Sequence, residues 1–115
     1  MNLGYYNGRH YTTYIEEVKQ LKRDGKLQDA EKLLLELIKA NEEENRVEKI
    51  GVSPWYYEQL AIIYHKQEDC PKEISILERY TKQKPPEHWN IQAISQRSMN
   101  DPLFLRLEKI KNRNK

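Results

Sequence analysis

The apolar residues of "LQDAEKLLLELIKA", residues 27–40, recur every three or four positions, and this spacing constrains the fold more than any other feature. Residues three or four apart lie on one side of an α-helix, so the segment predicts an amphipathic helix that buries one stripe. That stripe consists of Leu27, Ala30, Leu33, Leu34, Leu37 and Ile38. A similar stripe precedes it, at Tyr14, Ile15, Val18 and Leu21. Gly25 between them can take the positive φ that ends a helix, so we expect an antiparallel helical hairpin over residues 11–50.

Two prolines indicate a second hairpin over residues 53–85. Ser53 is a suitable N-cap, and Pro54 fits the first helical position, where its missing N–H costs nothing. The helix that follows carries an aromatic and aliphatic stripe at Trp55, Tyr57, Leu60, Ala61 and Tyr64. Pro71 starts the next helix, whose apolar positions are Ile74, Leu77 and Tyr80. Pro85 and Pro86 cannot continue that helix and therefore end it.

The helical signal weakens after residue 85. We expect an irregular linker or a short helix over residues 86–101, with "QRSMN" as a loop. Asp101 and Pro102 then start a C-terminal capping helix, over residues 102–115, with a basic end. Residues 1–10 are expected to form an N-terminal tail. No segment predicts a convincing strand, so the fold class is all-α.

Composition limits the classes of function. The chain of 115 residues is long enough for one domain, and its net charge of +2 is too small to indicate nucleic-acid binding by itself. Basic residues cluster near the first turn and at the C-terminal end, where they are Arg106, Lys109, Lys111, Arg113 and Lys115. Cys70 is the only cysteine, which excludes an internal disulfide and favours a reducing compartment. The chain shows neither a signal peptide nor a run of about 18 apolar residues, so we expect a soluble, cytoplasmic protein without a membrane partner.

The two hairpins resemble the tetratricopeptide (TPR) superfamily over residues 11–85. Its pattern is W-x2-L-G-x2-Y in the first helix of a repeat, then A-x3-F, then Pro. The second hairpin has Tyr57-x2-Leu60-Ala61-x2-Tyr64 and closes with Pro85, and the first hairpin has Ala30-x3-Leu34. Segments of both hairpins are also similar to uncharacterised bacterial helical-repeat proteins, some of which carry a HIRAN domain. The resemblance implies antiparallel hairpins stacked as a short TPR-like array.

The chain departs from the repeat pattern in several places: Glu17 replaces the usual Leu, and no proline ends the first repeat. Tyr14 and Tyr57 are 43 residues apart rather than about 34, so the second helix should be longer than usual. Glu73 stands where the family has a small Ala. We expect Ala30 and Ala61 to allow close helix packing, and Tyr14, Tyr57 and Tyr64 to lie in the core.

In the family, the first helix of each hairpin lines a concave groove that holds a partner segment. Transferred position by position, the resemblance implies groove residues Thr12, Ile15, Lys19, Lys22 and Arg23, followed by Trp55, Glu58, Ile62, His65 and Lys66. Tyr56 and Trp55 lie at the edge of the core stripe as possible surface anchors. The candidate partner-binding residues are therefore Lys19, Lys22, Arg23, Trp55, Tyr56, His65 and Lys66. Such a surface suits an acidic peptide or a phosphate-bearing partner.

The family's carboxylate clamp does not transfer, because it needs paired Asn and Lys where this chain has Ile15, Glu16 and Lys19. Binding to chaperone C-termini is therefore disfavoured. Two repeats also make a short groove, which leaves self-association or a second domain as ways to gain affinity.

Catalysis finds little support in the sequence. His65, Glu68 and Cys70 lie close together along the chain, but His65-x-x-Glu68 reverses the order of di-iron motifs and has no second copy. Cys70 has no base that the sequence fixes beside it. We expect no metal, no cofactor and no enzymatic activity. The leading hypothesis is a protein-interaction module or scaffold; a nucleic-acid accessory protein comes second and a small enzyme third.

Overall fold

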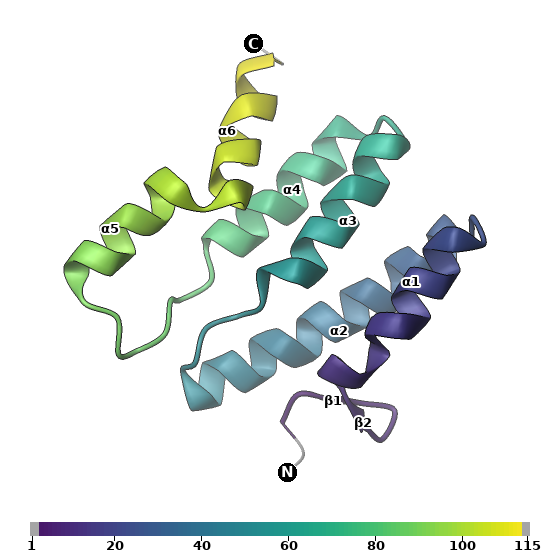
Figure 1. Ribbon diagram of the computed structural model, residues 1–115, viewed down its shortest axis with the longest axis horizontal. Helices are drawn as coiled ribbons and strands as arrows, with labels where there is room; N and C mark the ends of the chain where they lie inside the picture. The colour runs from purple at the N-terminus through teal and green to yellow at the C-terminus, as the bar shows by residue number, and fades with distance from the viewer. Residues whose placement is uncertain (1–2, 114–115) are drawn as a thin grey trace.

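The computed structural model describes residues 3–113, apart from the side chain of Ser98, and it is mostly helical (Figure 1). Its helices are α1 (Ile15–Arg23), α2 (Leu27–Glu48), α3 (Pro54–Lys66), α4 (Cys70–Thr81), α5 (Ile91–Asn100) and α6 (Pro102–Arg113). A 3-10 helix, η1 (Tyr11–Tyr14), leads into α1. The expected all-α class is confirmed at this level. None of the helices within residues 3–113 is both long and apolar enough to cross a bilayer.

The helices α1 to α4 lie side by side in chain order, with α1 antiparallel to α2 and α3 antiparallel to α4 (Figure 1). Gly25, with φ of 72°, makes the turn between α1 and α2, and Lys49 ends α2 in a left-handed conformation with φ of 55°. Ser53 is at the N-cap of α3 as predicted, but its side chain makes no capping bond. Its backbone N–H instead donates to Oδ1 of Asn41 at 2.8 Å, which ties the start of α3 to α2.

The core lies along the contacts between these helices. Leu34, Leu60 and Leu77 are fully buried, and so are the two small residues Ala30 and Ala61, whose size lets neighbouring helices approach closely. The tyrosines of the repeat pattern, Tyr14, Tyr57 and Tyr64, are buried as well. Their hydroxyls do not stay unsatisfied: Tyr57 donates to Glu42 and Tyr64 donates to Glu31, each at 2.8 Å. The aromatic stripe of α3 is thus a packing element, as its periodicity predicts.

The N-terminal residues differ from the predicted tail, because they fold into a two-stranded antiparallel hairpin of β1 (Tyr5–Tyr6) and β2 (Arg9–His10). Asn7 and Gly8 connect the strands with φ of 49° and 82°, the positive values of a tight hairpin turn. His10 fixes the hairpin to α2, since its Nε2 lies 2.7 Å from Oε2 of Glu44. A Cβ at Gly4 would come within 2.7 Å of that imidazole, so the close approach requires glycine.

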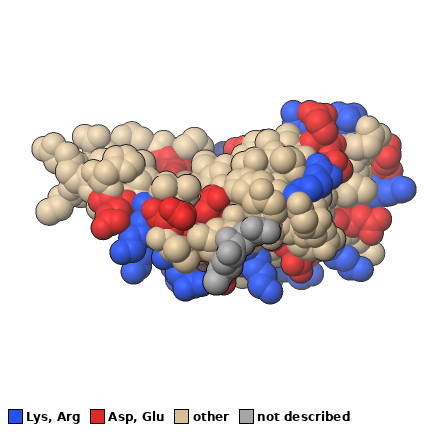
Figure 2. Space-filling model, turned by 90° about the horizontal axis from the view of Figure 1, so that it is seen from below, with Lys and Arg blue, Asp and Glu red and all other residues tan. Residues whose placement is uncertain are grey.

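The structure of residues 91–100 also differs from the prediction. "QRSMN" is not a loop but the last part of α5, which begins where the side chain of Asn90 accepts a hydrogen bond from the N–H of Ala93 at 2.8 Å. The apolar side chains of α5 face solvent, with Ile91 83% and Met99 71% exposed. In Figure 2 the end of the molecule where Figure 1 places α5 is accordingly almost uncharged.

The capping helix is present as α6, and it packs against α4. Much of its predicted basic end is not a free patch, because Arg106 pairs with Glu73 and Lys111 pairs with Glu78, both at 3.1 Å. Lys115, the last residue of that end, lies outside the described residues.

Candidate functional site

A hydrogen bond joins α1 to α3 on a surface that we call the α1/α3 face, which consists of Lys22 and the α3 residues Trp55, Gln59, Ile62 and Lys66. Lys22 of α1 is half-buried, and its Nζ donates a hydrogen bond to Oε1 of Gln59 on α3. Burial, and secondly the positive charge of Lys66, lower the pKa of the Lys22 ammonium, while Glu58 partly opposes them. The structure therefore brings Lys22 and Lys66 together on one surface.

A helical stripe of α3 continues this surface. Trp55, Gln59, Ile62 and Lys66 are spaced by four, three and four residues, which places them on one side of the helix. Trp55 and Ile62 are half-buried, so each presents part of its apolar side chain beside the lysines. The α1/α3 face thus combines two cations with an apolar edge.

Three other predicted residues are paired elsewhere or buried, and therefore do not add a free group to this surface. Lys19 pairs with Glu16 at 3.9 Å, and Arg23 donates to Gln20 at 2.9 Å, both on the exposed side of α1. Tyr56, predicted as a surface anchor, is only 2% exposed, so this prediction is wrong. Its ring packs edge-on against Tyr11 of η1, a contact that the apolar spacing within α3 cannot reveal. Burial raises the pKa of Tyr56 to about 12.

His65 turns toward α4 rather than toward α1. Its Nδ1 lies 3.2 Å from Oε1 of Glu73, a carboxylate that is almost fully buried and is also bound by Nε of Arg106 at 3.1 Å. Glu73, the departure from the repeat pattern, therefore links α3, α4 and α6. A buried carboxylate that pairs with an arginine and contacts a histidine is a structural connection, and removing Arg106 would leave its charge uncompensated.

The residues considered for catalysis border a small cavity of about 310 Å³ next to this connection. His65, Cys70 and Glu73 all line it, but no hydrogen bond joins the thiol of Cys70 to another residue in the described part of the chain. A nucleophile and its base need such a contact or one close to it. Across residues 3–113, no group of three or more His, Cys, Asp or Glu side chains is arranged to hold a metal ion.

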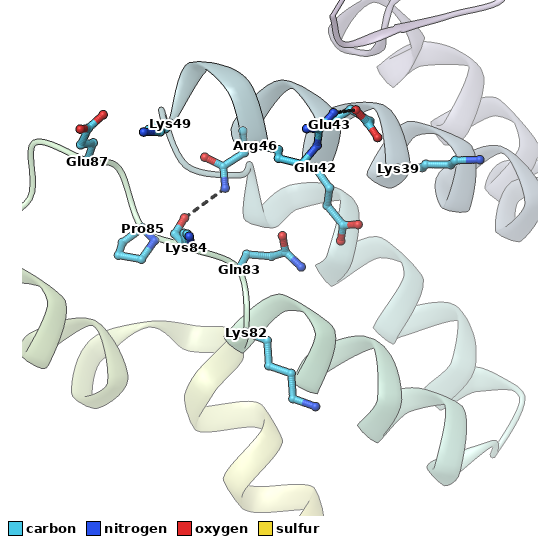
Figure 3. Close-up of a pocket in the computed structure, with 11 residues that line it drawn as sticks. Lys39, Glu42, Glu43, Arg46, Lys49, Lys82, Gln83, Lys84, Pro85 and Glu87 are labelled. Carbon is cyan, nitrogen blue, oxygen red and sulfur yellow. Dashed lines mark hydrogen bonds and ion pairs between the residues drawn. The ribbon is translucent and has the colours of Figure 1, made fainter.

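Sequence reasoning missed a second cleft, which we call the α2 cleft (Figure 3). It has a volume of about 610 Å³ and lies between the C-terminal half of α2 and the segment 82–87 that follows α4. The helix α2 has 22 residues and α4 only 12, and in Figure 1 the C-terminal end of α2 extends past the adjacent ends of α3 and α4. The long spacing between Tyr14 and Tyr57 is the signal in the sequence for this extension.

Asn45 holds the two walls of the α2 cleft together. Its Nδ2 donates to the carbonyl of Lys84 at 3.1 Å, and its Oδ1 accepts from the N–H of Gly51 at 2.7 Å. A second tie runs from the N–H of Glu87 to the carbonyl of Lys49 at 2.9 Å. Two hydrogen bonds therefore fix segment 82–87 against the end of α2, and the bond from Gly51 orients the Asn45 side chain that makes one of them.

The charges that line the α2 cleft are unevenly compensated. Glu42 is bound by Arg79 through two hydrogen bonds of 2.8 Å, and Glu43 pairs with Arg46 at 2.7 Å. The four lining lysines, by contrast, form no salt bridge with any residue between 3 and 113; they are Lys39, Lys49, Lys82 and Lys84. Glu87 is the one lining carboxylate that is likewise unpaired within that range. The cleft therefore carries an excess of positive charge.

The comparisons with known proteins add no assignment. A scan against models of protein families found no match, and searches of curated proteins and of solved structures found none either.

Proposed function

We propose that the protein is a non-catalytic, TPR-like interaction module that binds an acidic segment of a partner protein on the α1/α3 face. Two antiparallel hairpins with buried small residues at Ala30 and Ala61 support the repeat interpretation, and α6 covers α4 as a cap. In such an array the first helices of the hairpins, here α1 and α3, present the partner-binding surface.

The observation that carries the proposal is the hydrogen bond from Lys22 of α1 to Gln59 of α3, which holds a half-buried ammonium beside the helical stripe that also bears Lys66. Burial lowers the pKa of Lys22 first and the positive charge of Lys66 second, while Glu58 opposes them in part. A carboxylate from a partner would offset these positive charges while its neighbouring apolar residue packs on Trp55 or Ile62. An acidic segment with interspersed apolar residues therefore matches the face in both charge and chemistry.

A displayed library of random 16-residue peptides, selected on the full chain, tests this proposal. We expect the selected peptides to be enriched in Asp and Glu. Their affinity should fall about tenfold in the double variant Lys22→Gln/Lys66→Gln, since two charge contacts are lost. Lys26→Gln/Lys32→Gln changes the net charge equally at exposed positions of the same hairpin, and it should alter affinity less than about twofold.

Two results would overturn the proposal. One is a set of peptides that bind both double variants equally well. The other is a 20-nucleotide single-stranded DNA that binds the full chain more tightly than any selected peptide and shows a steep salt dependence, which would favour the nucleic-acid function.

A further inference from the structure

We propose that the α2 cleft is a second, separate site, which binds a small polyanion carrying at least two phosphate groups. Its volume of about 610 Å³ falls within the range of small-ligand sites, about 300–1,000 Å³. Figure 3 shows α2 along one side and segment 82–87 along the other, with lysines on both. The site lies away from Lys22 and Lys66, so it does not depend on the function proposed above.

The charges that line the α2 cleft indicate an anionic ligand. Because Glu42 and Glu43 are neutralised by Arg79 and Arg46, the uncompensated charges are four ammonium groups and the carboxylate of Glu87. A concave surface with an excess of one charge raises the local concentration of counter-ions. Lysine ammoniums act as mobile point charges, which suit phosphate oxygens that can be approached from many directions.

The spread of the lysines requires more than one phosphate. Lys39 and Lys49 are ten residues apart on α2, a distance of about 15 Å along the helix, and Lys82 and Lys84 stand on the opposite wall. One phosphate cannot reach this whole set. A chain or ring of phosphates can contact both walls at once.

The residues that line the α2 cleft favour a small polyanion over nucleic acid as the ligand. Sequence-independent binding of single strands uses aromatic side chains on which bases stack, and the lining of the α2 cleft contains no aromatic residue. The walls are preformed, since two hydrogen bonds, from Asn45 to Lys84 and from Glu87 to Lys49, hold segment 82–87 in place. A preformed site loses less conformational freedom when a small ligand binds.

Isothermal titration calorimetry with sodium tripolyphosphate at fixed ionic strength tests the site. We expect tripolyphosphate to bind at least about tenfold more tightly than orthophosphate, because only the former spans both walls. Lys49→Gln/Lys84→Gln should weaken tripolyphosphate about fivefold or more. Lys32→Gln/Lys109→Gln, which removes two exposed lysines outside the cleft, should change it less than about twofold, and so should Lys22→Gln/Lys66→Gln.

Equal weakening by all three double variants would overturn the proposal, because it would show a diffuse effect of net charge. Failure of tripolyphosphate to bind better than orthophosphate would overturn it as well. A second arm identifies the source of the phosphates: sedimentation with vesicles that contain phosphatidylinositol 4-phosphate, lost in Lys49→Gln/Lys84→Gln, supports the site with a lipid headgroup as ligand. Binding of tripolyphosphate without vesicle binding supports it with a soluble ligand.

Discussion

The α1/α3 face and the α2 cleft both present lysines, but they differ in how the lysines are held. On the α1/α3 face, Lys22 is half-buried, bonded to Gln59 and close to Lys66, at positions where the repeat pattern predicts a partner surface. In the α2 cleft, Lys49 at the end of α2 and Lys84 on the opposite wall are exposed and form no salt bridge among the described residues. The spacing of residues within one helix thus predicts which of them share a face, whereas the cleft beside the end of α2 depends on where a distant segment of the chain lies.

The largest effect is expected from a substitution in the core at α2, because the α1/α3 face and the α2 cleft both depend on the packing of this helix. Leu34 is fully buried, so Leu34→Ala should lower the free energy of unfolding by about 2–5 kcal/mol. Chemical denaturation measures this, with Lys32→Ala on the exposed side of α2 as the control, expected within about 0.5 kcal/mol of the parent chain. A loss for Leu34→Ala no greater than that of the control would place Leu34 outside the core and contradict the packing described here.

A substitution with a smaller effect on stability should affect the α2 cleft and leave the α1/α3 face intact. Asn45→Ala removes two hydrogen bonds of a buried side chain, and we expect a loss of stability of about 1–3 kcal/mol. Because segment 82–87 is then held less firmly, tripolyphosphate affinity should also fall, while binding of acidic peptides on the α1/α3 face should persist. Denaturation and calorimetry on the same samples check both parts. Peptide binding that falls in parallel with tripolyphosphate binding would show that the surfaces are not independent.

The smallest expected effect is that of Lys22→Met, which should slightly raise the free energy of unfolding, whereas Leu34→Ala and Asn45→Ala lower it. Folding lowers the pKa of Lys22, so the folded chain binds fewer protons than the unfolded chain between the lowered and the ordinary lysine pKa. The free energy of unfolding therefore rises with pH between the lowered pKa of Lys22 in the folded chain and its ordinary pKa in the unfolded chain. This gain in stability is lost as pH falls through the lowered pKa. Lys22→Met lacks this pH dependence, and at neutral pH it should match or slightly exceed the stability of the parent chain, by less than about 1 kcal/mol.

The pH dependence provides the measurement for Lys22→Met. Subtracting the stability of the variant from that of the parent chain removes the contribution of the buried tyrosines, which both share. The difference should rise from pH 7 toward the ordinary lysine pKa, while affinity for acidic peptides is lower in the variant throughout. A variant that is clearly less stable and binds peptide normally would make Lys22 a structural residue, not a partner-binding one.

The helical hairpins could be predicted from sequence because their stability comes from apolar stripes at fixed spacing, as in Leu34, Leu60 and Leu77. The N-terminal hairpin was missed, although Asn7-Gly8 is a strong local signal for a tight turn, because strands of two residues are too short to show alternation. The C-terminal part of α5 was missed because its apolar residues face solvent.

The placement of a candidate residue could be predicted only where one helix determines its environment. Lys22 and Lys66 lie on α1 and α3, the two helices that the sequence predicts for them. The burial of Tyr56 depends on Tyr11, and the orientation of His65 depends on Glu73, so both require contacts between distant segments. The α2 cleft depends on where segment 82–87 lies, which Asn45 decides through a hydrogen bond across 39 positions.

Mapping of both ligands on the ¹⁵N-labelled full chain by nuclear magnetic resonance tests the central claim most directly, that the chain has two separate anion-binding surfaces. With tripolyphosphate we expect amide shifts at residues 39–49 and 82–87, and with a selected acidic peptide at α1 and α3. Addition of the second ligand should leave the shifts caused by the first in place. Displacement of one ligand by the other, from a single shared set of amides, would contradict the account.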